Sequence, residues 1–235
     1  MKKLAVFVEG QTEQLLVERL ITEIANANDI AIENRKILGK SRCISQSVLI
    51  SNSGSDPGNK YFIQIIDCTG DPRVKSDIRD NYESLAASGF TAIIGVRDVY
   101  PDFSYAEIAQ LRSGLNYRLK TRPIQVVFVL GVMEIETWFI SEHTHFGRVD
   151  PALTTARIKA DLGFDPSVDD IQLRPIPHED LDAIYRLVRR RYKKDCRHVQ
   201  KVLDRLDYAL LYCDVLRRLP DLNVLTESIN TFLAP

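Results

Sequence analysis

Short apolar runs alternate with helical patterns along the first 130 residues or so, and this alternation limits the folds open to the chain. Four continuous runs have the pattern of strands buried on both faces of a sheet, and they are Leu4–Val8, Tyr61–Ile66, Thr91–Val96 and Ile124–Leu130. Because parallel neighbouring strands need a crossover helix between them, the alternation predicts an α/β fold. Its sheet is expected to be mostly parallel and four-stranded, with flanking helices.

The segments between these runs have apolar residues at helical spacing. Helices are expected over Thr12–Ala27, Val74–Ala87 and Ser104–Leu119, and Ser104 and Glu107 have the spacing of a capping box. A further candidate strand is Val48–Ile50. These helices are expected to cover the two faces of the sheet.

The second half of the chain has a different pattern, because no convincing strand follows residue 151. Helices are expected over Glu134–Glu142, Thr155–Leu162, Glu179–Tyr192 and Cys196–Leu219, separated by proline-containing loops. The sequence therefore predicts an α/β domain over residues 1–145 and a helical C-terminal part over residues 146–235.

The composition is that of an ordinary globular protein, with 235 residues, 45% hydrophobic residues and a net charge of −1. The longest apolar run, Ile124–Met133, is shorter than the roughly 20 residues that cross a bilayer. Glu9 interrupts the N-terminal apolar run too early for a signal peptide. The cysteines stand singly, as in a reducing compartment, and they are Cys43, Cys68, Cys196 and Cys213. These features predict a cytoplasmic protein with no membrane partner.

Acidic residues follow directly after several of the buried runs. Glu9 follows the first run, Asp98 the third, and Glu134 and Glu136 the fourth. The carboxyl ends of parallel strands meet at one edge of a sheet, and carboxylates gathered there repel one another unless a cation neutralises them. Oxygen ligands suit Mg²⁺ or Mn²⁺, so the sequence predicts a metal site. Residues two apart on a helix point about 200° apart, which favours Glu136 over Glu134.

The run Val8-Glu9-Gly10-Gln11-Thr12-Glu13, followed by a helix and later by a strand ending in Asp98, resembles a TOPRIM domain. This is the metal-dependent module of topoisomerases, DnaG-type primases and OLD-family nucleases. The run is most similar to the small stand-alone TOPRIM proteins of bacterial antiphage defence. The resemblance implies a Rossmann-like fold, with Glu9 as a catalytic acid, base or metal ligand and Asp98 as a Mg²⁺ ligand. It also implies that Glu13 and Glu136 match further acids of the family.

One part of the sequence departs from the TOPRIM pattern. The usual third-strand motif is D-x-D, whereas here Tyr100 stands at the second acidic position and the next acid is Asp102. Asp102 is a candidate for the missing metal ligand, and the alternative is that it only begins a turn. Glu13 has a similar alternative, since an acid in the first turn stabilises a helix.

A basic segment lies between Arg186 and Arg205. It holds nine basic residues and two acidic residues, a net charge of +7, and the rest of the chain carries −8. Such a segment favours a phosphate backbone or an acidic partner, and the alternative is a solvated helix face. The candidate nucleic-acid contacts are Arg189, Arg190, Arg191, Lys193, Lys194 and Arg197, together with Arg97 beside Asp98. The alternative role of Arg97 is a salt bridge with one of the acids at the same edge of the sheet.

The resemblance and the acidic residues together predict a Mg²⁺- or Mn²⁺-dependent nuclease that acts in antiphage defence. Its expected partners are RNA or DNA and a defence-system protein such as an ATPase, and it is a candidate homo-oligomer. The alternative is a TOPRIM-like interaction or sensor subunit that binds metal or nucleotide without cleaving, and Tyr100 favours this alternative.

Overall fold

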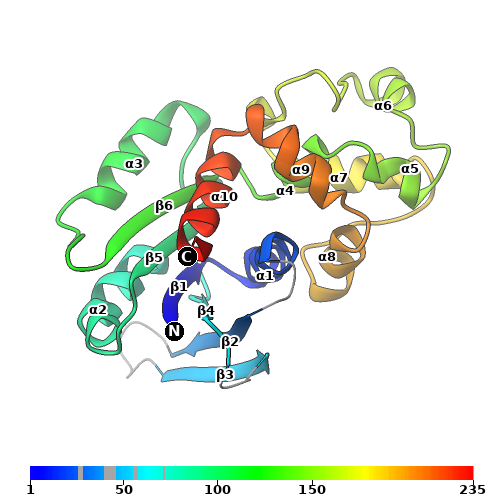
Figure 1. Ribbon diagram of the computed structural model, residues 1–235. Helices are drawn as coiled ribbons and strands as arrows, with labels where there is room; N and C mark the ends of the chain where they lie inside the picture. The colour runs from blue at the N-terminus through cyan, green and yellow to red at the C-terminus, as the bar shows by residue number, and fades with distance from the viewer. Residues whose placement is uncertain (26–28, 40–45, 55–57, 71, 235) are drawn as a thin grey trace. The chain divides into compact units, whose positions relative to one another are not determined.

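The computed structural model describes residues 1–25, 29–39, 46–54, 58–70 and 72–234. In this part of the chain the strands are β1 (Lys2–Val8), β2 (Ile30–Leu38), β3 (Gln46–Ser53), β4 (Tyr61–Asp67), β5 (Ala92–Asp98) and β6 (Gln125–Gly131). They form one sheet with the order β3-β2-β4-β1-β5-β6 (Figure 1). The pairs β1–β4, β1–β5 and β2–β4 are parallel, and β2–β3 is antiparallel. The predicted α/β fold with a mostly parallel sheet is therefore confirmed.

The predicted number of four strands is wrong, because the described sheet has six. All four predicted runs are strands, the candidate strand Val48–Ile50 lies within β3, and β2 was not predicted. The residues Glu33–Lys36 in the middle of β2 are polar or charged and interrupt its apolar run. The sheet tolerates these residues because they form hydrogen bonds and ion pairs. For example, Asn34 Nδ2 donates to Glu18 Oε2 and to Ser51 Oγ, both at 2.9 Å. β3 is an edge strand that is exposed along most of its length, so it lacks a hydrophobic pattern.

Helices follow β1, β4 and β5, as the alternation predicts. They are α1 (Gln11–Ala25), α2 (Arg73–Ala87) and α3 (Ile108–Asn116). Figure 1 shows α1 on one face of the sheet and α2 on the other. The capping box before α3 is confirmed, since the backbone N–H of Ser104 donates to Glu107 Oε2 at 2.9 Å.

The centre of the sheet is covered by apolar side chains. Every residue of Leu4–Val8 in β1 is fully buried. On α1, the buried residues Leu16, Val17, Leu20 and Ile21 recur at helical spacing. Full burial of an aliphatic side chain is worth about 1.5–3 kcal/mol, so this central strand and its helix contribute much of the stability of the fold.

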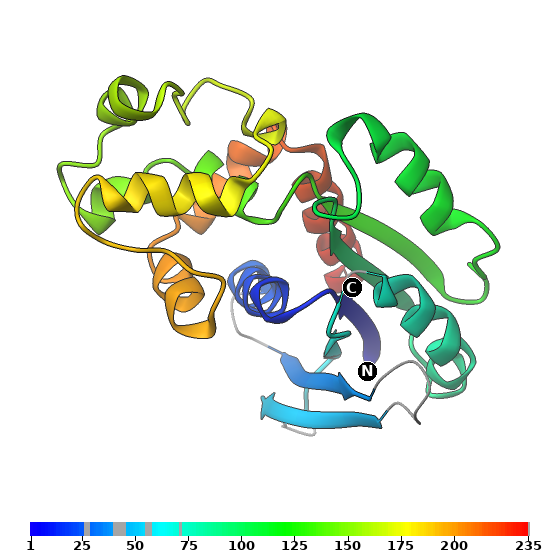
Figure 2. The same cartoon turned by 180° about the vertical axis from the view of Figure 1, so that it is seen from behind.

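Helices dominate the chain after β6, and no strand follows β6 in the described residues, as predicted. The helices are α4 (Glu136–Ser141), α5 (His145–Val149), α6 (Thr155–Leu162), α7 (Pro177–Arg186), α8 (Cys196–Leu203), α9 (Tyr208–Cys213) and α10 (Pro220–Leu233). α7 packs beside α4, as seen from behind in Figure 2.

Two of the predicted helices, Glu179–Tyr192 and Cys196–Leu219, differ most from the observed ones. α7 ends at Arg186 because Arg189 has a φ of +59° and the N–H of Arg190 turns back to donate to the carbonyl of Tyr185 at 3.0 Å. The predicted helix over Cys196–Leu219 is broken into shorter helices, since Asp207 accepts the N–H of Leu210 and begins a new one. Most of the basic segment therefore lies on a loop and on α8.

The chain divides into two compact units that interleave along the sequence. The first unit is Met1–Arg97, Gln110–Val129 and Leu225–Pro235, and the second is Asp98–Ala109 and Leu130–Val224. The end of α10 returns to the first unit, where the Tyr61 hydroxyl donates to the carbonyl of Leu233 at 2.6 Å. The strand that ends in Asp98 thus leads directly from one unit into the other.

Among the described residues, no helix is both long and apolar enough to cross a membrane. Cys68, Cys196 and Cys213 are free thiols. Cys43 lies outside the described residues.

His145 is buried in the second unit, where its Nδ1 atom lies 2.6 Å from the carbonyl of Glu142 and 3.8 Å from Glu142 Oε2. Burial lowers the pKa of His145 to about 3, and the nearby Arg148 and Arg205 add to this effect. The stability that neutral His145 contributes is therefore complete above the unfolded pKa of about 6.5 and is lost as the pH falls towards 3.

We expect the free energy of unfolding to fall by about 2 kcal/mol between pH 7 and pH 5 through His145 alone, because only the unfolded state takes up the proton. Urea unfolding of the wild type and of His145→Gln at a series of pH values measures this slope. An equal slope in the two proteins would contradict the assignment to His145.

Candidate metal centre

Three carboxylates come together at the end of β5 and in the segment after β6. Asp98, Glu134 and Glu136 each offer an oxygen, and these oxygens lie within 4.8 Å of one another. The three residues are 1%, 3% and 0% exposed, respectively. We call them the carboxylate cluster, and all three belong to the second unit.

Backbone hydrogen bonds position the cluster. The N–H of Val99 lies 3.1 Å from both the Gly131 and the Met133 carbonyls, and the N–H of Tyr100 donates to the Met133 carbonyl at 2.7 Å. The turn after β6 is thereby fixed to the residues that follow Asp98. The same turn presents the N–H of Ile135 to Asp98 Oδ1 at 2.9 Å, which orients the carboxylate.

Gly131 leaves the space that the Asp98 carboxylate occupies. A Cβ atom at this position would lie 2.3 Å from Asp98 Oδ1 and 2.9 Å from the nitrogen of Ile135. Neither neighbour is the free end of a flexible side chain, since one is hydrogen-bonded to the other. Glycine is therefore needed here for close approach.

We expect Gly131→Ala to lower the free energy of unfolding by about 2 kcal/mol, because the new methyl group must displace the carboxylate or the turn. Gly147→Ala is the matched control, since a Cβ atom at Gly147 in α5 meets nothing within 4 Å. Thermal unfolding of both variants measures the difference. Equal stability of the two variants would show that the turn after β6 shifts to accommodate the methyl group with no loss of stability.

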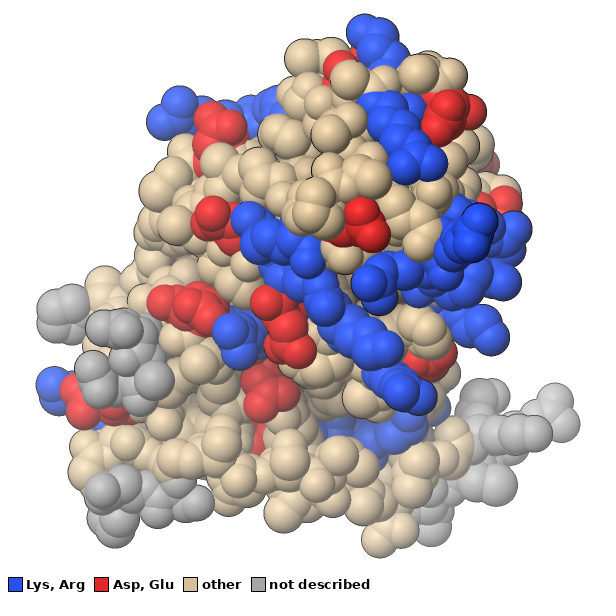
Figure 3. Space-filling model, turned by 90° about the vertical axis from the view of Figure 1, so that its right-hand side faces the viewer, with Lys and Arg blue, Asp and Glu red and all other residues tan. Residues whose placement is uncertain are grey.

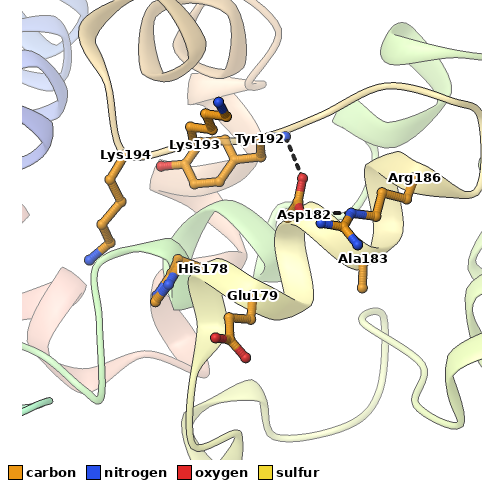
Figure 4. Close-up of a pocket in the computed structure, with 8 residues that line it drawn as sticks. All are labelled: His178, Glu179, Asp182, Ala183, Arg186, Tyr192, Lys193 and Lys194. Carbon is orange, nitrogen blue, oxygen red and sulfur yellow. Dashed lines mark hydrogen bonds and ion pairs between the residues drawn. The ribbon is translucent and has the colours of Figure 1, made fainter.

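The ammonium of Lys194 lies among the three carboxylates. Its Nζ atom is 3.4 Å from Asp98 Oδ2, 3.0 Å from Glu134 Oε1 and 3.2 Å from Glu136 Oε2. The side chain is 34% exposed. In Figure 4 Lys194 and His178 extend to the same side, whereas the neighbouring Lys193 points away. One cation of the chain therefore already neutralises part of the cluster.

Further donors bind the outer oxygens of the two glutamates. Glu134 accepts the backbone N–H of His178 at 2.8 Å and lies 2.7 Å from the Nδ1 atom of the same residue. Glu136 Oε1 accepts the hydroxyl of Tyr192 at 2.7 Å. The other oxygen of Glu136 is buried and accepts no hydrogen bond from the described residues, although the Lys194 ammonium is near it.

The electrostatics of the cluster leave room for a further positive charge. Burial raises the pKa of Glu136, the Lys194 ammonium opposes this rise, and the Glu134 carboxylate adds to it. With all three acids ionised, the cluster and Lys194 together carry a charge of −2. Either a proton or a cation relieves this imbalance.

The donor set fits a hard metal ion. All three side chains offer oxygen atoms, which Mg²⁺, Mn²⁺ and Ca²⁺ prefer. The buried oxygen of Glu136 that accepts no hydrogen bond is an available ligand atom. The carboxylate cluster could therefore bind a metal ion, which would compete with the Lys194 ammonium for the same oxygens.

The other acids of the predicted site are not part of this cluster. Glu9 follows β1 in the first unit and is half-buried, and its carbonyl accepts the N–H of Gly70 at 2.9 Å. Glu13 is buried, and its Oε2 atom accepts the N–H of Gly10 at 2.9 Å at the start of α1. Asp102 is exposed. Metal binding by these three residues stays a prediction from the resemblance, whereas the hydrogen bond from Gly10 to Glu13 at the start of α1 is observed.

The sequence did not predict that Glu134 belongs to the cluster. The preference for Glu136 over Glu134 assumed that both lie on one helix, but α4 begins only at Glu136. Glu134 lies in the preceding turn and joins the cluster from there. The partners His178, Tyr192 and Lys194 lie more than 40 residues away along the chain, and no local pattern indicates them.

The predicted nucleic-acid contacts differ in their surroundings. Arg97 is 6% exposed, and Lys194 is occupied by the carboxylate cluster. Arg191 is exposed and pairs with Asp182 at 2.9 Å. The remaining candidates are exposed and form no ion pair with any acid among the described residues, and they are Arg189, Arg190, Lys193 and Arg197.

Comparisons with known proteins add information about the fold alone. No family model and no curated protein matches the chain. The structure is similar to the crystal structure of a hypothetical protein from Pyrococcus horikoshii OT3, with a TM-score of 0.52 and 14% sequence identity over 100% of both chains. At this identity the likeness shows a shared α/β architecture, without indicating an activity.

Proposed function

We propose that the protein is a metal-dependent nuclease that cleaves phosphodiester bonds of nucleic acid at the carboxylate cluster. The observation that carries the proposal is the convergence of three buried carboxylates within 4.8 Å at the end of a parallel strand. Ligands of open parallel sheets bind beyond the carboxyl ends of the strands, so the cluster has the position expected of a site.

Asp98, Glu134 and Glu136 would hold the metal ion, and Mg²⁺ or Mn²⁺ is the proposed identity because all the ligands are carboxylates. A bound divalent ion of this kind polarises a phosphoryl oxygen and lowers the pKa of a coordinated water. The TOPRIM resemblance adds Glu9 as a catalytic acid or base, with Glu13 and Asp102 as further candidate ligands.

A pocket lies beside the side chains that contact the cluster, although none of the three carboxylates lines it. The pocket has a volume of about 550 Å³, and its lining includes His178, Tyr192, Lys193 and Lys194 (Figure 4). Three of these, His178, Tyr192 and Lys194, also contact the carboxylate cluster. The ammonium of Lys194 suits a phosphate oxygen, and it would be released to bind one when a metal ion takes its place.

The biological setting is proposed from the TOPRIM resemblance. It is antiphage defence in the cytoplasm of a prokaryote, together with a partner protein such as an ATPase. The substrate is RNA or DNA, and the active form is a candidate homo-oligomer.

The second candidate function is a non-catalytic subunit that uses the same site for binding or sensing. It is favoured by Lys194, which already lies within 3.4 Å of each carboxylate and supplies a cation without a metal ion. Tyr100, which stands at the second acidic position of the D-x-D pattern, favours it too. In this case the cluster and Lys194 would form a structural ion-pair network.

Incubation of the purified protein with tRNA, single-stranded DNA and duplex DNA, in Mg²⁺, Mn²⁺ or EDTA, tests the two functions. The nuclease proposal predicts cleavage of at least one substrate that EDTA abolishes. Absence of cleavage with either metal, for a protein that binds Mn²⁺, would favour the non-catalytic function.

A further inference from the structure

A second, cationic groove lies in the second unit, apart from the pocket at the carboxylate cluster. It has a volume of about 310 Å³, and basic side chains from the loop after α7 and from α8 dominate its lining. We call it the Arg205 groove, and the lining residues on which the argument depends are Tyr185, Arg189, Arg190, His198, Lys201 and Arg205. Figure 3 looks onto the side of the molecule that carries α7 and α8, where Lys and Arg side chains gather.

Most of the cations of this groove are not neutralised by the protein. Arg189, Arg190 and Lys201 form no ion pair among the described residues. Arg205 donates to the backbone carbonyl of Lys201 at 2.6 Å and forms no ion pair with the described acids. His198 differs, since its Nδ1 atom lies 2.8 Å from Asp195. Four like charges gathered in one concave site repel one another, so an anion bound there lowers their free energy.

The groove also contains a buried hydroxyl that has no partner. Tyr185 is 6% exposed, and its hydroxyl makes no hydrogen bond to the described residues. Burial raises the pKa of Tyr185, and the nearby Arg205 opposes this rise, so the hydroxyl stays protonated and able to donate. Edge contacts with Phe146 and Tyr192, at centroid distances of 6.4 Å, hold the ring in place. A buried donor of this kind is normally satisfied by a protein, water or ligand acceptor.

We propose that the Arg205 groove binds phosphoryl groups, which offer several charged acceptor oxygens to both the guanidinium groups and the hydroxyl. Phosphoryl groups occur in the backbone of a nucleic-acid strand and in free polyphosphate compounds. The strand as ligand rests on the proposed nuclease function, for which the groove would hold the substrate at a distance from the bond that is cleaved. The free compound as ligand does not depend on that function.

The groove is tested by binding measurements on the whole protein in EDTA, so that cleavage does not interfere. The probes are a fluorescent single-stranded oligonucleotide and inorganic triphosphate. Lys201→Gln is expected to weaken binding by about fivefold or more and to reduce the salt slope of strand binding by about one unit. The matched control is Lys159→Gln on α6, outside the groove, which is expected to bind within twofold of the wild type.

Tyr185→Phe separates ligand binding from a structural role, because the variant keeps the ring and removes only the unpartnered hydroxyl. We expect it to weaken binding by about threefold to tenfold while the salt slope stays unchanged, since no charge is removed. Its thermal stability is expected to equal or exceed that of the wild type, because an unsatisfied buried group is lost.

The two probes identify the source of the phosphoryl group. If Lys201→Gln weakens binding of the oligonucleotide, the ligand of the groove is a nucleic-acid strand. If Lys201→Gln weakens binding of triphosphate and leaves binding of the oligonucleotide unchanged, the ligand is a free polyphosphate compound. Affinities for both probes that are unaffected by Lys201→Gln, or equally reduced by Lys159→Gln, would overturn the proposal. The nuclease function fails separately, if the wild type binds a strand through the groove but cleaves nothing in Mg²⁺ or Mn²⁺.

Discussion

Asp98→Asn is expected to reduce metal-dependent cleavage of nucleic acid by about 10²- to 10³-fold, the usual effect of removing one charged or hydrogen-bonding group from the centre of a reaction site. Asparagine keeps the shape of the side chain and an oxygen that can accept the N–H of Ile135. The substitution therefore removes a metal-binding charge and leaves the turn after β6 in place. Initial cleavage rates at saturating Mn²⁺ measure the effect.

Asp161→Asn is the matched control for this experiment, because Asp161 is an exposed acid on α6 and lies outside the carboxylate cluster. We expect its cleavage rate to stay within about twofold of the wild type, as for most surface substitutions. A large loss in a third variant, Asp102→Asn, with little change in Asp98→Asn would place the metal on the second acid of a D-x-D-like motif and contradict the assignment to the cluster.

Lys194→Met is expected to destabilise the metal-free protein by about 2–3 kcal/mol. The carboxylates of the cluster are 1%, 3% and 0% exposed, and the substitution removes the ammonium that lies among them. Breaking a fully buried ion pair costs about 3–5 kcal/mol, and the estimate is lower here because Lys194 is 34% exposed. The melting temperature in EDTA is then about 5–10 °C below that of the wild type.

The same variant is expected to respond more strongly to metal ions. Without the competing ammonium the cluster binds Mn²⁺ more tightly, and ligand binding to the folded state raises the melting temperature. Lys193→Met is the control, since Lys193 is exposed and forms no ion pair among the described residues. Equal melting temperatures of the two variants in EDTA, and equal increases with Mn²⁺, would show that the Lys194 contacts contribute nothing to stability or to metal competition.

The central strands of the sheet were predictable because a strand that is buried on both faces has a continuous run of apolar residues. Leu4–Val8 is apolar at every position, and every position is buried. β2 could not be recognised in the same way, because polar residues in its middle, such as Asn34, bond to side chains from α1 and β3. Those partners are known only after the chain has folded.

The carboxylate cluster was partly predictable for a related reason. Asp98 stands two residues after the end of the buried run Thr91–Val96, which is a local signal of an acid at the edge of the sheet. The position of Glu134 depends on where α4 begins, and helix boundaries are poorly determined by local sequence. Lys194 belongs to a basic run whose members look alike in sequence, and within the described part of the chain it is the member that contacts the cluster.

Titration of the protein with Mn²⁺ in a calorimeter, for the wild type and for Asp98→Asn, tests most directly whether the carboxylate cluster is a metal site. We predict that Mn²⁺ binds the wild type and that Asp98→Asn weakens its affinity by about tenfold or more, because one of three anionic ligands is lost. Absence of Mn²⁺ binding to the wild type, or equal affinity in Asp98→Asn, would contradict the metal site and with it the proposed nuclease.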